Sequence, residues 1–199
     1  MRWHKFISTL LHPFIIPTVG LFFYLIFIPI SLTVTQQLTI LSIVFISTYV
    51  IPLLLLVFLK AVGYIDSAEL FDIKERKVIL FIVINLMLLV AALFKNLSIV
   101  SDLRFLFYGA ALGLAIVYLL FFAKLKCSLH LFAMGAMVGY FLVFQQIHQI
   151  NTIFLIAALL IISGFLASSR LSLKTCIPTE VYTGFFIGFT SQLIAYIFL

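Results

Sequence analysis

The sequence predicts an all-α membrane protein, a polytopic bundle of six to seven transmembrane helices. Hydrophobic residues make up 65% of its 199 residues and charged residues only 9%, against about 25% charged in a typical soluble domain. Several apolar runs approach the roughly 20 residues that a spanning helix needs. Because lipid offers the backbone no hydrogen-bond partners, such runs fold as helices. We expect one integral membrane domain, residues 1–199, without a removable signal peptide, since no small-residue cleavage site follows the first apolar run.

Seven apolar runs are candidate spans by this criterion of length. The first is flanked or bent by Pro13, Pro17 and Pro29, and a bundle of six spans would leave it out. The sixth has only about 16 residues. It would cross the bilayer if the helix were tilted little or if it continued into Ser168 and Ser169. The seven runs are residues 13–31, 38–59, 78–94, 103–123, 129–147, 152–167 and 180–198.

Glycines four residues apart recur within three of these runs. The pairs are Gly109 with Gly113, Gly135 with Gly139 and Gly184 with Gly188. Small residues at this spacing let helix backbones approach closely, and that packing holds helices together in lipid. We interpret these glycines as packing positions and not as ligand contacts.

The ionisable residues gather in alternate connections between the runs. With seven spans, the connections 60–77, 124–130 and the polar stretch 168–179 share one face with the amino terminus. That face carries ten of the twelve Lys and Arg residues, all except Lys95 and Arg104. The positive-inside rule places this face in the cytoplasm. We expect the plasma (inner) membrane, and we expect these basic residues to orient helices or meet lipid headgroups, not nucleic acid.

The stretch that follows the sixth run has the most regular polar spacing in the chain. It reads Ser169, Arg170, five residues, Cys176, three residues and Glu180. An earlier connection on the same face holds Ser128 and His130, and the connection before that holds Arg76 and Lys77. Three polar segments that converge on one end of a bundle predict a site there.

These segments resemble, in order and spacing, the three signatures of the type 2 phosphatidic acid phosphatase superfamily. The third signature is S-R-x5-H-x3-D, here with Cys176 in place of the nucleophilic histidine and Glu180 in place of the aspartate. The second, P-S-G-H, matches at Ser128 and His130. In the first, K-x6-R-P, Arg76 fits the arginine, while Glu69 and Lys77 stand where the family has lysine and proline.

The resemblance implies a bundle that hydrolyses a phosphorylated lipid without metal or cofactor. Arg76 and Arg170, assisted by Lys77, Ser128 and Ser169, would bind the phosphate oxygens. His130 would protonate the leaving oxygen, Cys176 would be the nucleophile if deprotonated, and Glu180 would orient it. The expected lipid is a phospholipid such as phosphatidic acid, or a polyprenyl phosphate or pyrophosphate. Family members usually act on the non-cytoplasmic face, against the charge rule, so the face that carries the site stays open.

Several alternatives compete with this interpretation. The protein is also consistent with a catalytically inactive relative that binds a lipid headgroup or a membrane partner. Arg170 and Lys174 fit ordinary headgroup anchors, and Cys176 fits a buried inert thiol. Cys127 and Cys176 would supply a zinc site together with His130 and Glu180, or form a disulfide. A transporter is disfavoured because the spans hold almost no ionisable residues. His4, His12 and His148 match no motif and receive no role.

Overall fold

The chain folds as an all-α bundle of membrane-crossing helices, as the sequence predicts. The computed structural model describes residues 3, 11–29, 32–64 and 73–199, and these residues form helices and connections without a β-strand. Six helices in this part of the chain are long and apolar enough to cross a bilayer. Large apolar side chains such as Phe154 and Phe198 face outward from the bundle, where lipid would cover them.

The six spans follow one another with short connections. The first is a continuous helix built from α3, a π-helical turn η1 and α4, and a short 3-10 turn η2 (Ser98–Val100) precedes α6. The sixth predicted run continues further than its apolar residues indicated, through Ser169 and Arg170 to Ser172. The bounds are α3 Val34–Phe45, η1 Ile46–Val50, α4 Ile51–Ala61, α5 Ile73–Lys95, α6 Leu103–Phe122, α7 Leu129–His148, α8 Ile153–Ser172 and α9 Pro178–Phe198.

The run predicted at 13–31 does not form a full span. It holds α2, Ile16–Phe27, which has 12 residues and is therefore about 18 Å long at 1.5 Å per residue. A bilayer core is about 30 Å thick. Proline explains the truncation, because its ring removes a backbone donor and is tolerated only in the first turn. Pro17 lies in the first turn of α2 and Pro29 follows its end.

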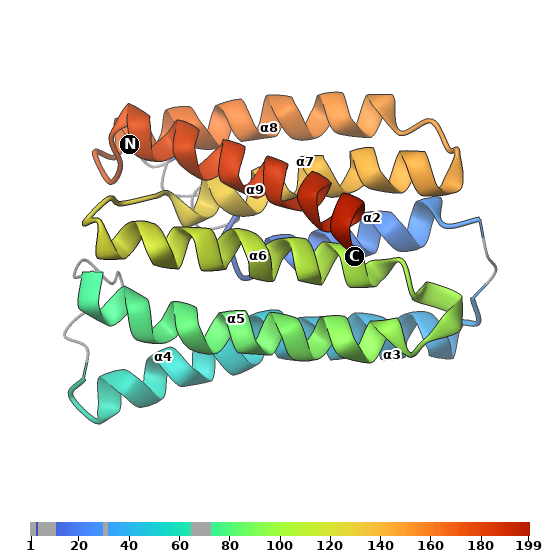
Figure 1. Ribbon diagram of the computed structural model, residues 1–199, viewed down its shortest axis with the longest axis horizontal. Helices are drawn as coiled ribbons and strands as arrows, with labels where there is room; N and C mark the ends of the chain where they lie inside the picture. The colour runs from blue at the N-terminus through green and yellow to red at the C-terminus, as the bar shows by residue number, and fades with distance from the viewer. Residues whose placement is uncertain (1–2, 4–10, 30–31, 65–72) are drawn as a thin grey trace.

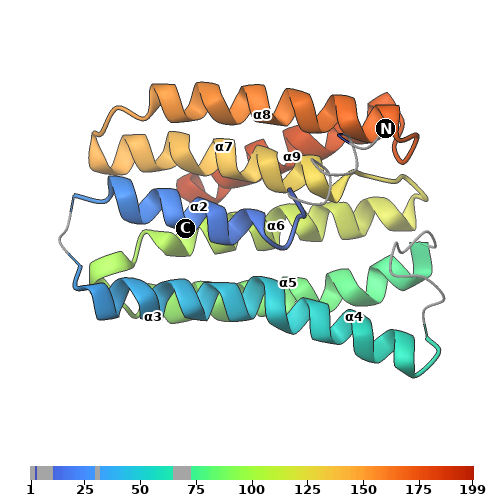
Figure 2. The same ribbon diagram turned by 180° about the vertical axis from the view of Figure 1, so that it is seen from behind.

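The predicted grouping of the polar connections is confirmed. In Figure 1 the end of α4, the start of α5, the α6–α7 connection and the α8–α9 connection all lie at the left end of the bundle. Figure 2 shows the same grouping from behind, with α2 running from the interior of the bundle to the opposite end. Because α2 ends at the far side, the connections between helices still alternate between the two ends of the bundle.

The predicted glycine pairs lie at close helix contacts, which confirms their packing role. A Cβ on Gly139 would lie 2.6 Å from the carbonyl oxygen of Phe189, and one on Gly184 would lie 2.5 Å from that of Ser128. Gly135 and Gly188 face the backbone of the same two helices, α7 and α9. Since ordinary Cβ contacts begin at about 3.4 Å, only glycine permits this separation of α7 from α9.

Candidate functional site

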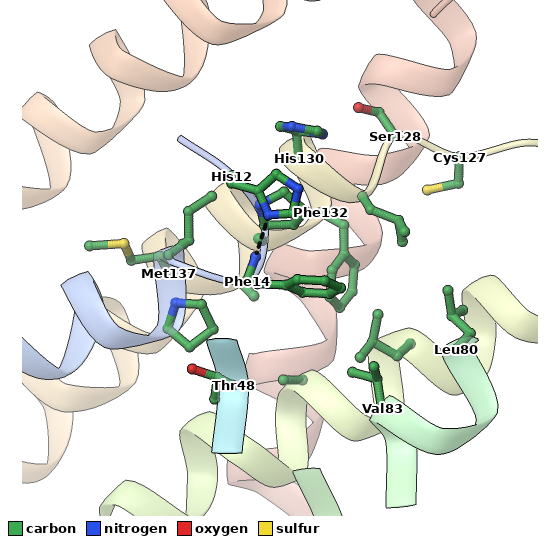
Figure 3. Close-up of a pocket in the computed structure, with 18 of the residues that line it drawn as sticks. His12, Phe14, Thr48, Leu80, Val83, Cys127, Ser128, His130, Phe132 and Met137 are labelled. Carbon is green, nitrogen blue, oxygen red and sulfur yellow. Dashed lines mark hydrogen bonds between the residues drawn. The ribbon is translucent and has the colours of Figure 1, made fainter. Parts of the chain in front are cut away.

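A cavity of about 610 Å³ opens within the bundle near the end that carries the polar connections. Figure 3 shows His12, His130, Ser128 and Cys127 along one side of it and Thr48, Leu80 and Val83 along the other. Five of the predicted site residues line this cavity: Arg76, Ser128, His130, Arg170 and Cys176. They come from α5, the start of α7, α8 and the α8–α9 connection, so the predicted convergence of the three segments is confirmed.

The end of α8 explains the spacing between Arg170 and Cys176. Lys174 adopts a left-handed conformation with φ of 53°, and the Thr175 N–H donates to the Arg170 carbonyl at 3.3 Å. This six-to-one bond is the signature of a Schellman helix end. The Thr175 hydroxyl donates to the same carbonyl at 3.0 Å. The chain therefore turns back, and Cys176 Sγ lies 3.8 Å from Arg170 Nη2.

The start of α7 presents polar groups to the cavity. The Ser128 N–H donates to the Glu180 carbonyl at 3.0 Å, which fixes this segment against α9. Ser128 is 3% exposed, and its hydroxyl has no hydrogen-bond partner among the described residues. It makes no capping bond to α7 either. The first backbone N–H groups of a helix have no acceptor within it and attract anions, so this helix end and Ser128 both suit an anionic ligand.

Among the described residues that line the cavity, the charged side chains are positive, and two histidines line it as well. The described residues that line it include Arg76, Arg170, His12 and His130, and they include no Asp or Glu. Both arginines are half-buried. A guanidinium presents several donors in one plane, which suits the oxygens of a phosphate group. The lining therefore favours a negatively charged ligand with several acceptor oxygens.

Three residues predicted for the site do not line the cavity. The Ser169 hydroxyl donates to the Phe165 carbonyl of its own helix at 2.8 Å. One Glu180 carboxylate oxygen lies 3.4 Å from the Ile177 N–H and accepts from it at the start of α9. The Lys77 ammonium lies 3.7 Å from the centre of the Phe122 ring, a cation–π contact. In this arrangement Glu180 caps the start of α9, Ser169 bonds within α8, and Lys77 lies on the Phe122 ring instead of lining the cavity.

Both cysteines are free thiols, so the structure contains no disulfide between Cys127 and Cys176. Cys127 is 2% exposed, and burial raises the pKa of its thiol to about 12. Among the described residues, no three His, Cys, Asp or Glu side chains lie close enough to hold a metal ion together. The zinc hypothesis built on these cysteines with His130 and Glu180 therefore has no geometric support.

Two polar features escaped the sequence analysis. His12 lines the cavity, with its ring centre 5.7 Å from that of His130. At the opposite end, Asp102 accepts from the Tyr24 hydroxyl at 2.7 Å and pairs with His148 Nε2 at 2.8 Å. Neither histidine belongs to a local motif. The available sequence signal for His12 was the pair of prolines that follows it, Pro13 and Pro17. They start α2 inside the bundle, and the residues before the helix therefore lie there too.

Comparisons of the chain with protein-family models, curated proteins and solved structures return no match. The fold and the cavity define the class of protein. It is an integral membrane helical bundle, and its cavity has a basic part and an apolar part. The resemblance to the phosphatase superfamily rests on the motif residues alone.

Proposed function

We propose that the protein binds a phosphorylated membrane lipid, with the phosphate group held between Arg76, Arg170 and Ser128. One observation carries this proposal. Two guanidinium groups, an uncapped helix start and a buried hydroxyl that has no partner among the described residues meet in a cavity whose described lining has no carboxylate. Positive groups and oriented backbone donors of this kind stabilise phosphate. The order of the motifs, similar to that of the type 2 phosphatidic acid phosphatases, supports the same ligand.

The apolar part of the cavity supports a lipid over a free phosphate ion. Beyond the polar groups the lining is apolar and includes Leu80, Val83, Met87 and Leu114. These surfaces suit a hydrocarbon chain, whereas a free phosphate ion makes no use of them. Because lipid tails are as apolar as these side chains, the match is one of shape and polarity and not a hydrophobic gain. Phosphatidic acid and a polyprenyl pyrophosphate combine both parts, and we expect the protein to meet them in the plasma (inner) membrane.

Hydrolysis of the bound phosphate is the reaction that these residues would perform. The Cys176 thiolate would attack phosphorus, forming an S–P bond while the P–O bond to the lipid breaks, and His130 would give its proton to the leaving oxygen. Water would then attack the S-phosphoryl group and release inorganic phosphate and the thiol. The second candidate is a protein that binds without turnover. The position of Glu180 favours it, because one carboxylate oxygen accepts from the Ile177 N–H at the start of α9, and this bond competes with a role in orienting Cys176.

Binding is tested with the purified protein in nanodiscs that contain phosphatidic acid or, as control, phosphatidylcholine. We expect preferential binding of phosphatidic acid and a loss of about tenfold or more in Arg170→Gln, since a hydrogen bond to a charged group contributes about 1.5–3 kcal/mol. Lys174→Gln is the matched control, because Lys174 is exposed in the same connection and does not line the cavity. Equal affinity for both lipids would reject the proposal.

Turnover is tested by phosphate release from phosphatidic acid and from polyprenyl pyrophosphate. The parent is compared with Cys176→Ala and Cys176→His. Activity in the parent that disappears in the alanine variant supports the cysteine mechanism. No release by the parent, with release by the histidine variant, supports a binding protein that has lost its nucleophile. Equal release by parent and alanine variant rejects Cys176 as the nucleophile.

A further inference from the structure

The segment before α2 brings a second imidazole to the cavity. The His12 carbonyl accepts from the Ile15 N–H at 2.9 Å and from the Ile16 N–H at 3.3 Å. These bonds form the turn that starts α2, so the position of His12 is fixed by the half-length helix. Its ring packs edge-on against Phe14 at 5.0 Å between centres and against His130 at 5.7 Å. His12 is thus held beside one of the predicted site residues by several independent contacts.

We propose that His12 contacts the bound phosphate and donates a hydrogen bond to it from Nε2. This inference rests on the proposed function and names a residue that the motifs omit. Figure 3 shows the His12 ring beside that of His130, with its bond to Phe14 on the side away from His130. The other residues that bring charge or a titratable group to this cavity are Arg76, Arg170, Cys127 and Cys176.

The hydrogen bond to Phe14 assigns the proton on the ring. The Phe14 N–H donates to His12 Nδ1, with 3.4 Å between the nitrogens, so Nδ1 carries a lone pair and Nε2 carries the hydrogen in the neutral ring. Burial and the positive charge of Arg170 lower the pKa of His12, which keeps the ring neutral near pH 7. A neutral ring in this tautomer is a donor at Nε2, and the described residues offer that nitrogen no acceptor by hydrogen bond.

Two substitutions separate ligand contact from packing. His12→Phe keeps a ring of similar shape but removes the donor, whereas His12→Gln keeps an amide N–H near the position of Nε2. We expect His12→Phe to weaken binding of phosphatidic acid by about tenfold and His12→Gln to recover most of that loss. His148→Gln is the control, because His148 is the last residue of α7, whose opposite end carries Ser128 and His130. Thermal unfolding of each variant shows whether the fold is retained.

A second measurement uses the unaltered protein and needs no folded variant. Diethyl pyrocarbonate modifies neutral imidazole, and mass spectrometry locates the product on each histidine. We expect phosphatidic acid, compared with phosphatidylcholine, to slow the modification of His12 and to leave that of His148 unchanged. An unchanged rate at His12, or equal affinity of His12→Phe and the parent while Arg170→Gln loses binding, overturns this inference alone. Absence of binding by the parent overturns the proposed function and the inference together.

Discussion

Gly184 is the position at which packing and site meet, and its replacement by alanine has a calculable consequence. The new Cβ would lie 2.5 Å from the Ser128 carbonyl oxygen and 3.3 Å from Cys127 Sγ. Ordinary contact begins at 3.4 Å, so the backbones would have to separate by about 0.9 Å, the difference between 3.4 and 2.5 Å. The Ser128 carbonyl is not free to move, because it accepts the first bond of α7 from Phe132 at 2.9 Å.

The expected loss of stability follows from two opposing terms. Overpacking against fixed backbone costs about 1–3 kcal/mol, and alanine returns about 0.5–1 kcal/mol relative to glycine within a helix. The net loss of roughly 0–2.5 kcal/mol would lower the unfolding temperature by up to about 5–10 °C for a chain of this size. Gly164→Ala is the matched control, since no atom lies within 4 Å of its Cβ position and only the helix term applies.

Thermal unfolding in detergent measures this difference through Cys127, which is buried in the folded protein. A thiol-reactive fluorophore is added to variants that also carry Cys176→Ala. Since the sequence has two cysteines, Cys127 is then the remaining thiol. Gly184→Ala should unfold below the parent and Gly164→Ala at or above it. If Gly184→Ala unfolds with the parent, the close approach of α7 to α9 is not the constraint described.

Three further outcomes are expected. Asp102→Asn should lower the unfolding temperature, because the pair with His148 loses its charge at a cost of about 1–3 kcal/mol; an unchanged temperature contradicts a stabilising role. Lys77→Met should keep the affinity for phosphatidic acid within about twofold of the parent, since the Lys77 ammonium lies on an aromatic ring. A tenfold loss of affinity would show that Lys77 belongs to the phosphate site. Iodoacetamide should label Cys176 before Cys127 near pH 8, because thiolate is the reactive form and burial raises the pKa of Cys127 to about 12. Labelling of Cys127 should therefore accelerate as the pH rises toward 12, and early labelling of Cys127, located by mass spectrometry, would contradict its burial.

The sequence was sufficient to predict the bundle and its polar end because both depend on local patterns. Apolar length identifies a span, and alternation of spans assigns each connection to an end. Glycine spacing likewise predicted where helices approach, as Gly184 and Gly188 confirm. The run 13–31 forms only the half-length α2, because hydropathy does not register where proline stops a helix, and the six remaining spans agree with the lower of the two predicted counts.

The rest of the site depends on contacts between segments that are distant in the chain. His12 reaches His130 only because α2 starts inside the bundle, and Asp102 reaches His148 across 46 positions. Motif spacing also cannot tell where a side chain points. Glu180 and Lys77 lie within or beside the motifs, yet the first caps a helix and the second lies on Phe122.

The start of α2 forms part of the cavity wall. Ile16 and Pro17 line the cavity from the first turn of the helix, and His12, Pro13 and Phe14 line it from the turn before. Pro13 and Pro17 are therefore as much a part of the binding space as the two arginines that line it. Lengthening α2 toward its amino terminus would draw His12 into the helix and so would move a residue that we propose to contact the ligand.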